Sequence, residues 1–244
     1  PIPTYRNTGV MNSAQRVQLS KEIIETGISL PAFPREIGYE AAYLRMINKD
    51  ISYAEFNEEV TRLEKMNTNW FKALGRTAIS QNYHLNFNSG KDGMAYYASF
   101  GYRKENSSYI GNDRNTYTGM LNFKFNSSPK IKLALHISGY HITTSGYYTG
   151  INPEQYALTT SRAIAKEQFY SNGKNGVLQY TRNDVHFNLL HELEYTGNDN
   201  KTSELNLGAH LTWKPLPYLN LTVTPAWSQG SNDSELWADA RSWN

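Results

Sequence analysis

Hydrophobic and polar residues alternate one by one through four segments between residues 81 and 142. In the first segment, tyrosine, leucine and phenylalanine alternate with asparagine and histidine. A period of two is typical of a β-strand with one apolar face and one polar face. Short turn sequences at 89–93 and 127–130 connect the segments in pairs. The pattern therefore predicts two β-hairpins.

Two further segments, 205–213 and 219–224, show the same alternation and are joined by the proline-rich turn 214–218. The chain therefore contains six predicted strands. Strands of about ten residues are long enough to cross a bilayer at a tilt.

The polar face of these strands distinguishes between membrane and soluble β-proteins. It carries mainly Asn, His, Lys, Ser and Thr, as in the wet interior of a transmembrane β-barrel, while the opposite face is apolar and suits contact with lipid. A soluble β-sandwich alternates too, so the period alone leaves that class open. The residues that we predict to face the lumen are Asn82, His84, Asn86, Asn122, Lys124, His136, Asn206 and His210.

The lengths of the connections alternate between short and long. Outer-membrane barrels have short periplasmic turns and long extracellular loops. We therefore predict an all-β membrane protein: an antiparallel transmembrane β-barrel segment with long, partly helical extracellular loops. Its parts are the end of a preceding strand (1–5), a helical extracellular loop (6–79), four barrel strands (80–145), a long extracellular loop (146–200), two barrel strands (201–228) and the start of the next extracellular loop (229–244).

The first long loop contains helical patterns. A capping box begins at Ser52 and Glu55. Phe56, Val60 and Leu63 then follow at helical spacing and form an apolar stripe that needs a surface to pack against. We expect this loop and the second one to meet a lipoprotein lid or a second barrel.

Composition excludes several classes. The 244 residues are 39% hydrophobic, and no run approaches the roughly 20 apolar residues that a membrane-spanning helix needs. The net charge is +2, and the scattered Lys and Arg predict no nucleic-acid partner. Without cysteine there is no disulfide or thiolate metal site. Because six strands cannot close a barrel, we expect further strands elsewhere in a longer protein.

Several motifs are similar to those of one transporter family, the SusC/RagA family of TonB-dependent outer-membrane transporters. No single motif is diagnostic, but their order and spacing together are specific, and the resemblance covers essentially the whole chain. Asn69 and Lys72 depart from it, because family members often have Asp at these positions. The motifs are Met11-Asn12-Ser13, Leu19-Ser20-Lys21-Glu22-Ile23, Asn67-Thr68-Asn69-Trp70-Phe71, Gln81-Asn82-Tyr83-His84-Leu85, Tyr96-Tyr97-Ala98-Ser99-Phe100-Gly101-Tyr102, Asn152-Pro153-Glu154-Gln155-Tyr156-Ala157 and Glu192-Leu193-Glu194-Tyr195-Thr196-Gly197-Asn198.

The resemblance implies a 22-strand barrel in the outer membrane of a Gram-negative, Bacteroidetes-like cell. It implies import of an oligosaccharide or oligopeptide, energised by TonB through an N-terminal plug that these residues do not contain. The implied partners are a SusD-like surface lipoprotein, the bilayer and a second copy of the transporter. Neither an enzymatic reaction nor a cofactor is implied.

Other candidate chemistry is weaker. Six histidines invite a metal site, but those in the strands alternate with the apolar face, and His186 with His191 lacks the spacing of a zinc motif. Ser171 and Lys174 fit an S-x-x-K pattern without its partner motifs. We therefore assign no catalytic or metal-binding residue.

Tyrosines in the second long loop are the candidate contacts for the imported molecule or the lid. Amphipathic rings suit such interfaces, although packing of the loop against itself is an equal alternative. The candidates are Tyr147, Tyr148, Tyr156 and Tyr170. A different class of function, a non-transporting outer-membrane adhesin or a secreted glycan-binding β-sandwich, stays open at this level.

Overall fold

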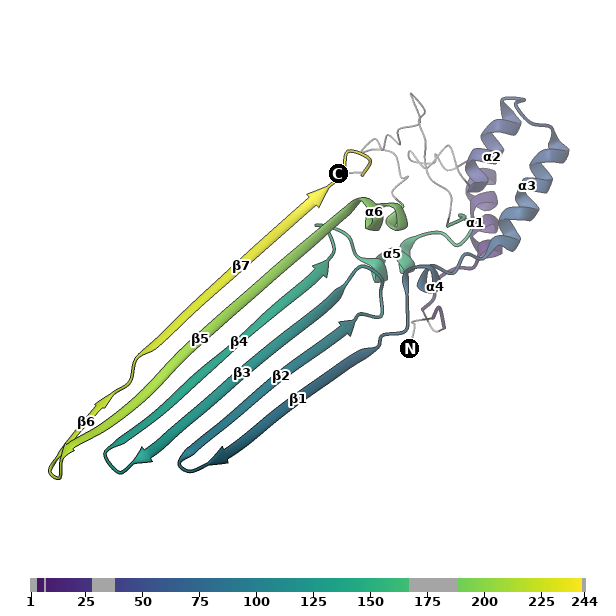
Figure 1. Ribbon diagram of the computed structural model, residues 1–244. Coiled ribbons are helices and arrows are strands. Elements are labelled where there is room, and N and C mark those ends of the chain that lie inside the picture. Colours follow the sequence, from purple (N-terminus) through teal and green to yellow (C-terminus); the bar gives the residue numbers. More distant parts are fainter. Residues whose placement is uncertain (1–3, 7, 28–37, 167–187, 243–244) are drawn as a thin grey trace.

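The computed structural model describes residues 4–6, 8–27, 38–166 and 188–242. They form one long antiparallel sheet with a helical body at one end (Figure 1). The strands are β1 (Ser80–Lys91), β2 (Met94–Asn106), β3 (Asp113–Ser128), β4 (Ile131–Gly146), β5 (Thr196–Leu216), β6 (Leu219–Val223) and β7 (Ala226–Ala238).

The strands form a meander in which β1 to β6 neighbour one another in chain order, and β7 also pairs with β5. Short turns join β1 to β2, β3 to β4 and β5 to β6, all at the sheet end away from the helices (Figure 1). At the first turn Asp92 and Gly93 both have positive φ, 51° and 81°. This is the requirement of a type I′ hairpin turn, so the local sequence fixes this register.

The edge opposite β1 is one strand in two pieces. β6 pairs with the lower part of β5, and β7 pairs with the upper part. Pro225 lies between them and has no N–H to donate, although its carbonyl oxygen accepts from the N–H of Ala209 at 2.9 Å. The break is therefore a local interruption of a single pairing path along β5.

Two predicted boundaries were wrong. β5 begins at Thr196, inside the segment predicted as loop 146–200, and β7 runs to Ala238, inside the segment predicted as loop 229–244. These two stretches pair with each other over 13 positions, from Thr196 with Ala238 to Gly208 with Ala226. Residues 196–204 of β5 and 228–235 of β7 are mainly polar on both faces, so no hydrophobic alternation predicts a strand there. Backbone pairing, which sequence does not display, makes them strands.

The helices are α1 (Ser13–Glu25), α2 (Gly38–Ile47), α3 (Tyr53–Met66), α4 (Trp70–Leu74), α5 (Pro153–Thr159) and α6 (Leu189–Tyr195). The predicted capping box at the start of α3 is confirmed. The Ser52 Oγ accepts from the Glu55 N–H at 3.2 Å, and the Glu55 carboxylate accepts from the Ser52 N–H at 2.7 Å. No helix in the described ranges combines the length and apolar character that membrane crossing requires.

Helices α1 to α3 enclose the first hydrophobic core. Phe56, Val60 and Leu63 are buried there against α1 and α2, together with Val17 and Ala42. The predicted apolar stripe is thus confirmed. However, the stripe packs within this chain and by itself requires no lipoprotein or second barrel.

The second core joins the two segments predicted as long loops. Its buried members are Trp70, Phe71 and Leu74 of α4 with Ile151, Ala157 and Leu189. The Trp70 indole N–H donates to the Ser161 carbonyl at 3.0 Å, and the Thr68 N–H donates to the Arg162 carbonyl at 2.8 Å. The two excursions therefore form one body.

The N-terminal residues contribute to this core. Residues 1–3 of the predicted strand end lie outside the described residues, and neither Thr4 nor Tyr5 is in a strand. The Tyr5 ring lies 4.8 Å from that of Phe71, and its hydroxyl donates to the Ala157 carbonyl at 3.0 Å.

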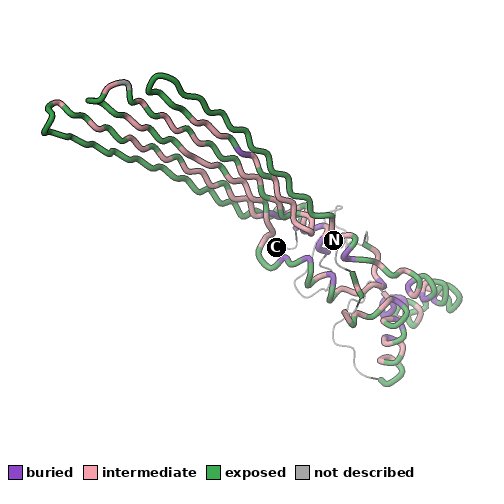
Figure 2. The backbone as a smooth tube through the Cα atoms, turned by 90° about the horizontal axis from the view of Figure 1, so that it is seen from below, coloured by how far each residue is buried: buried purple, intermediate pink, exposed green. Residues whose placement is uncertain are grey.

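Burial differs sharply between the two parts of the molecule. Almost all buried residues lie in the helical body, whereas the sheet is exposed or intermediate along nearly its full length (Figure 2). In the described residues the sheet is not closed. The fold is therefore a mostly antiparallel, open sheet, and no layer of the described part of the chain covers either of its faces.

Candidate functional site

Strand register sorts the side chains onto two faces of the sheet. Residues paired across an antiparallel ladder lie on the same face. Asn122 pairs with His136 and Lys124 with Ala134, which pairs with His210. The same pairings place all eight residues predicted to face the lumen on one face of the sheet, which we call the polar face. That this face borders a lumen remains a prediction.

Hydrogen bonds connect neighbouring strands across the polar face. His136 Nδ1 lies 2.6 Å from Asn122 Oδ1, and the Tyr97 hydroxyl donates to Asn86 Oδ1 at 3.2 Å. His210 Nδ1 lies 3.0 Å from the Thr224 hydroxyl, beside the break at Pro225. These side chains are thus fixed by polar partners within the sheet, as a hydrated surface allows.

Gly101 leaves room for two other polar side chains on this face. A Cβ on Gly101 would lie 2.5 Å from the Thr118 hydroxyl and 3.0 Å from His84 Nδ1. Only glycine lets these two polar side chains approach from both sides, which is a recurrent reason for glycine inside a strand.

The opposite face is apolar and exposed. Most of its large hydrophobic side chains are exposed, and Tyr102, Phe123, Phe125 and Leu133 are intermediate in exposure. A contiguous exposed apolar surface of this kind is rare on soluble monomers and marks an interaction with a partner or with lipid. It includes Leu85, Phe100, Leu121, Leu135, Leu207 and Leu221.

A row of aromatic rings limits this apolar face toward the helical body. Tyr83, Tyr102, Tyr117 and His141 are register partners on β1 to β4. Successive ring centroids lie 6.2, 4.9 and 6.3 Å apart. We call this row the aromatic belt.

Beyond the aromatic belt the same face becomes polar. The next row contains Lys104, Asn115, Thr143, Lys201 and Asp233. The apolar band on β2 therefore covers residues 94–102 only, within the about ten residues that we expected for a strand. Strands β1 to β5 are longer, from 12 residues in β1 to 21 in β5.

Three of the four tyrosines predicted to contact the imported molecule or the lid are in the described residues and lie at the helical end of the sheet. The Tyr147 hydroxyl donates to the Ile110 carbonyl at 2.9 Å, and the Tyr156 ring meets that of Trp70 edge-on at 5.3 Å. Tyr148 packs half-buried against the same core, and Tyr170 lies outside the described residues. For Tyr147 and Tyr156 these contacts are those of loop packing, so binding by them remains a prediction.

Burial changes the acidity of both hydroxyls. Loss of water around the ring raises the pKa of Tyr147 to about 12 and that of Tyr156 to about 12. At Tyr147 the nearby Arg76 opposes this shift, and Asp113 supports it. Both side chains are neutral at physiological pH.

The described residues contain no group of three or more His, Cys, Asp or Glu that could hold a metal ion. His84, His136 and His210 lie on three different strands, in three different rows of the polar face. His186, Ser171 and Lys174 fall outside the described residues.

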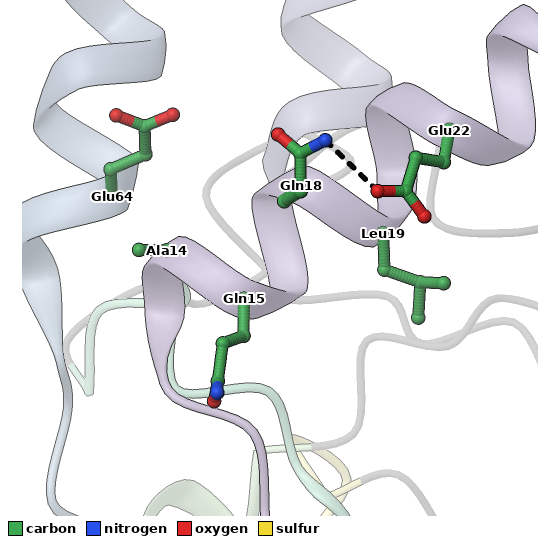
Figure 3. Close-up of a pocket in the computed structure, with 6 residues that line it drawn as sticks. All are labelled: Ala14, Gln15, Gln18, Leu19, Glu22 and Glu64. Carbon is green, nitrogen blue, oxygen red and sulfur yellow. Dashed lines mark hydrogen bonds between the residues drawn. The ribbon is translucent and has the colours of Figure 1, made fainter.

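A shallow groove on the helical body has a volume of about 480 Å³ (Figure 3). It lies along α1 and is closed on one side by Glu64 of α3. Gln18 Nε2 donates to Glu22 Oε1 at 3.0 Å along the helix, and Lys21 pairs with Glu64 at 2.8 Å. Such solvated helix-surface pairs offer no arrangement for chemistry.

Sequence analysis missed two polar-face residues, Tyr140 and Glu204. The Tyr140 hydroxyl donates to Glu204 Oε2 at 2.9 Å. Tyr140 is two positions after Ser138, and Glu204 is two positions before Asn206. Because side-chain direction in a strand repeats every two residues, the sequence already indicated that both lie on the polar face.

The chain is similar in fold to part of the RagAB peptide importer. The match to the importer structure in the closed-closed state has a TM-score of 0.59 and 18% sequence identity over 92% of this chain. The match to the open-open state has a TM-score of 0.59 and 17% identity over 96% of this chain. Neither a family model nor a curated protein matches the sequence.

The chain spans about a quarter of the length of these importer chains, 26% in both cases. At 17–18% identity the likeness establishes the fold and no more. These neighbours are transporters rather than enzymes. The single sheet, with its apolar face uncovered in the described residues, also lacks the second sheet that a β-sandwich would pack against it.

Proposed function

We propose that this chain forms part of the barrel wall of an outer-membrane importer for oligomeric nutrients, either oligopeptides or oligosaccharides. Six strand paths supply one sector of the wall, and the remaining strands close it. The helical body then lies outside the cell, and the three short turns face the periplasm. The chain binds and passes its cargo without changing it covalently.

The observation that carries this proposal is the distribution of side chains over the two faces of the sheet. One face is an exposed apolar band that ends at the aromatic belt, and the other is mainly polar. Apolar outer bands flanked by aromatic girdles around a polar interior are the signature of transmembrane barrels. Open strand edges in lipid would leave backbone groups unpaired, so this function requires the closing strands.

The partners follow from the same assignment. We propose that a SusD-like surface lipoprotein covers the extracellular helical body, that TonB energises import through a plug, and that two transporters associate. The similarity to a peptide importer favours an oligopeptide as the first cargo to test. We propose that the cargo is carried across the outer membrane into the cell.

The test is uptake by cells that express the full-length transporter with its lipoprotein partner. Labelled oligopeptides and oligosaccharides are supplied separately, with and without functional TonB. We expect uptake of at least one class, and we expect it to depend on both the transporter and TonB. Cells that lack the transporter are the control for leakage.

Two results would contradict the proposal. Uptake of both classes at the level of control cells would exclude import. A full-length protein that refolds as a soluble monomer without detergent would exclude the membrane assignment, because the apolar band would then have to be buried within the chain.

A further inference from the structure

Glu204 is the only carboxylate on the polar face between the level of the aromatic belt and the short turns, among the described residues. It lies on β5 opposite Tyr140 of β4 and Gly230 of β7. Its neighbour Ser203 pairs with His141 of the aromatic belt on the other face, so Glu204 is level with the belt. If the helical body is extracellular, this is just inside the mouth of the barrel.

Two donors hold the carboxylate in place. The Tyr140 hydroxyl donates to Oε2 at 2.9 Å, and the Asn206 side-chain amide donates to Oε1 at 2.6 Å. A carboxylate has about four lone-pair sites, so about two remain for a ligand. The anion is oriented before any ligand arrives, which reduces the entropy lost on binding.

The space beside the carboxylate is open on the β7 side. Gly230 is the partner of Glu204 there and has no side chain. A Cβ at Gly230 would make only an ordinary contact, 3.6 Å from the Ser203 carbonyl oxygen. Packing therefore does not demand glycine at this position.

No cation of the described polar face lies near enough to neutralise Glu204. Arg103 is one row above but on β2, three strand spacings or about 14 Å away, and it pairs with Glu105 at 2.6 Å. Lys124 is three rows below on β3. Charges that are separated by more than about 8 Å across water are largely screened at physiological ionic strength.

We propose that Glu204, positioned by Tyr140 and Asn206, binds an ammonium or guanidinium group of a peptide cargo as it enters the barrel. This inference rests on the proposed import function and narrows its substrate class to peptides with a free amino terminus, lysine or arginine. A fixed carboxylate without a neighbouring cation attracts such groups, and the gap at Gly230 admits them.

The experiment compares uptake of three blocked peptides of equal length that differ at one position, carrying Lys, Gln or Glu. The full-length transporter is used, at equal surface amounts of wild type and variants. We expect the wild type to favour the Lys peptide over the Gln peptide by about two- to fivefold, the range of a partly exposed ion pair. In Glu204→Gln this preference should disappear.

Matched variants separate charge from structure. Glu105→Gln removes the other polar-face carboxylate, which already has Arg103, and should leave the Lys preference unchanged. Gly230→Val should reduce the preference without removing the charge, and it serves as the second test if Glu204→Gln does not reach the surface.

Each remaining outcome overturns one of the two proposals. If Glu204→Gln lowers uptake of all three peptides equally, the carboxylate supports the barrel and does not select cargo. If the wild type imports only oligosaccharides, this inference fails while import stands. If the wild type imports neither class, the proposed function itself fails.

Discussion

At the scale of single residues, the hydroxyls of Tyr147 and Tyr156 make the free energy of unfolding depend on pH in the alkaline range. The ordinary pKa of tyrosine is about 10, and burial raises both to about 12. Between pH 10 and 12 the unfolded chain loses these protons while the folded chain keeps them. The contribution of these two hydroxyls to the free energy of unfolding is therefore fully present below pH 10, and it is lost as the pH rises through about 12.

The measurement is an ultraviolet titration of tyrosinate in the wild type and in Tyr147→Phe and Tyr156→Phe. Each variant should lack one group that titrates near pH 12. Tyr218, whose side chain is 85% exposed at the β5–β6 turn, provides the control Tyr218→Phe. Loss of a group near pH 10 from the Tyr147 variant would mean that its hydroxyl is solvated.

Two paired glycines on the apolar face should respond differently to the same substitution. Gly119 and Gly139 are register partners. A Cβ at Gly139 would lie 2.7 Å from the Glu204 carbonyl oxygen, whereas a Cβ at Gly119 would meet nothing within 4 Å. Gly139→Ala should therefore destabilise the sheet by about 1–3 kcal/mol.

Gly119→Ala is the matched control and should be neutral or slightly stabilising, because alanine restricts the unfolded chain more than glycine does. The effect of both substitutions on stability is measured as the urea midpoint of the purified transporter in vesicles. Equal midpoints for the two variants would show that a Cβ at Gly139 does not come close to the Glu204 carbonyl oxygen.

At the scale of the strand, neighbouring residues on β4 should differ because they lie on opposite faces. Leu135 is near the middle of the apolar band, and His136 is on the polar face with Asn122. Arginine at a lipid-facing midplane position costs about 2–4 kcal/mol, and far less in a wet interior.

We therefore expect Leu135→Arg to lower the unfolding free energy in vesicles by about 2–4 kcal/mol, and His136→Arg by much less. Similar losses for the two variants would refute the assignment of the faces. The reverse order would place the polar face against lipid.

At the scale of the whole molecule, the helical body and the short turns should lie on opposite sides of the outer membrane. This chain contains no cysteine, so introduced thiols are specific within it. Asn57 is exposed on α3, and Tyr218 is exposed at the far end of the sheet. An impermeant thiol reagent on intact cells should label Asn57→Cys and spare Tyr218→Cys.

Lysed cells supply the control, because both variants should then react. Labelling of Tyr218→Cys alone on intact cells would invert the topology. Labelling of both on intact cells would indicate that the sheet does not cross the membrane.

The sequence by itself determined the six alternating strands, the division of their residues between two faces, and the capping box at Ser52. Each of these is a local property, since side-chain direction in a strand repeats every two residues and a helix cap involves four. Hydrophobic spacing likewise predicted that Phe56, Val60 and Leu63 share one helix face.

Only the tertiary structure decided what those elements meet. The stripe on α3 is buried by α1 and α2 of the same chain, and Tyr156 packs on Trp70, far away in sequence. The polar strand ends of β5 and β7 exist because they pair with each other. The Glu204 site likewise needs the β4–β5 register, which brings Tyr140 within hydrogen-bond distance across 64 positions of sequence. Such long-range pairings depend on the summed energy of the whole sheet, and no local pattern encodes them.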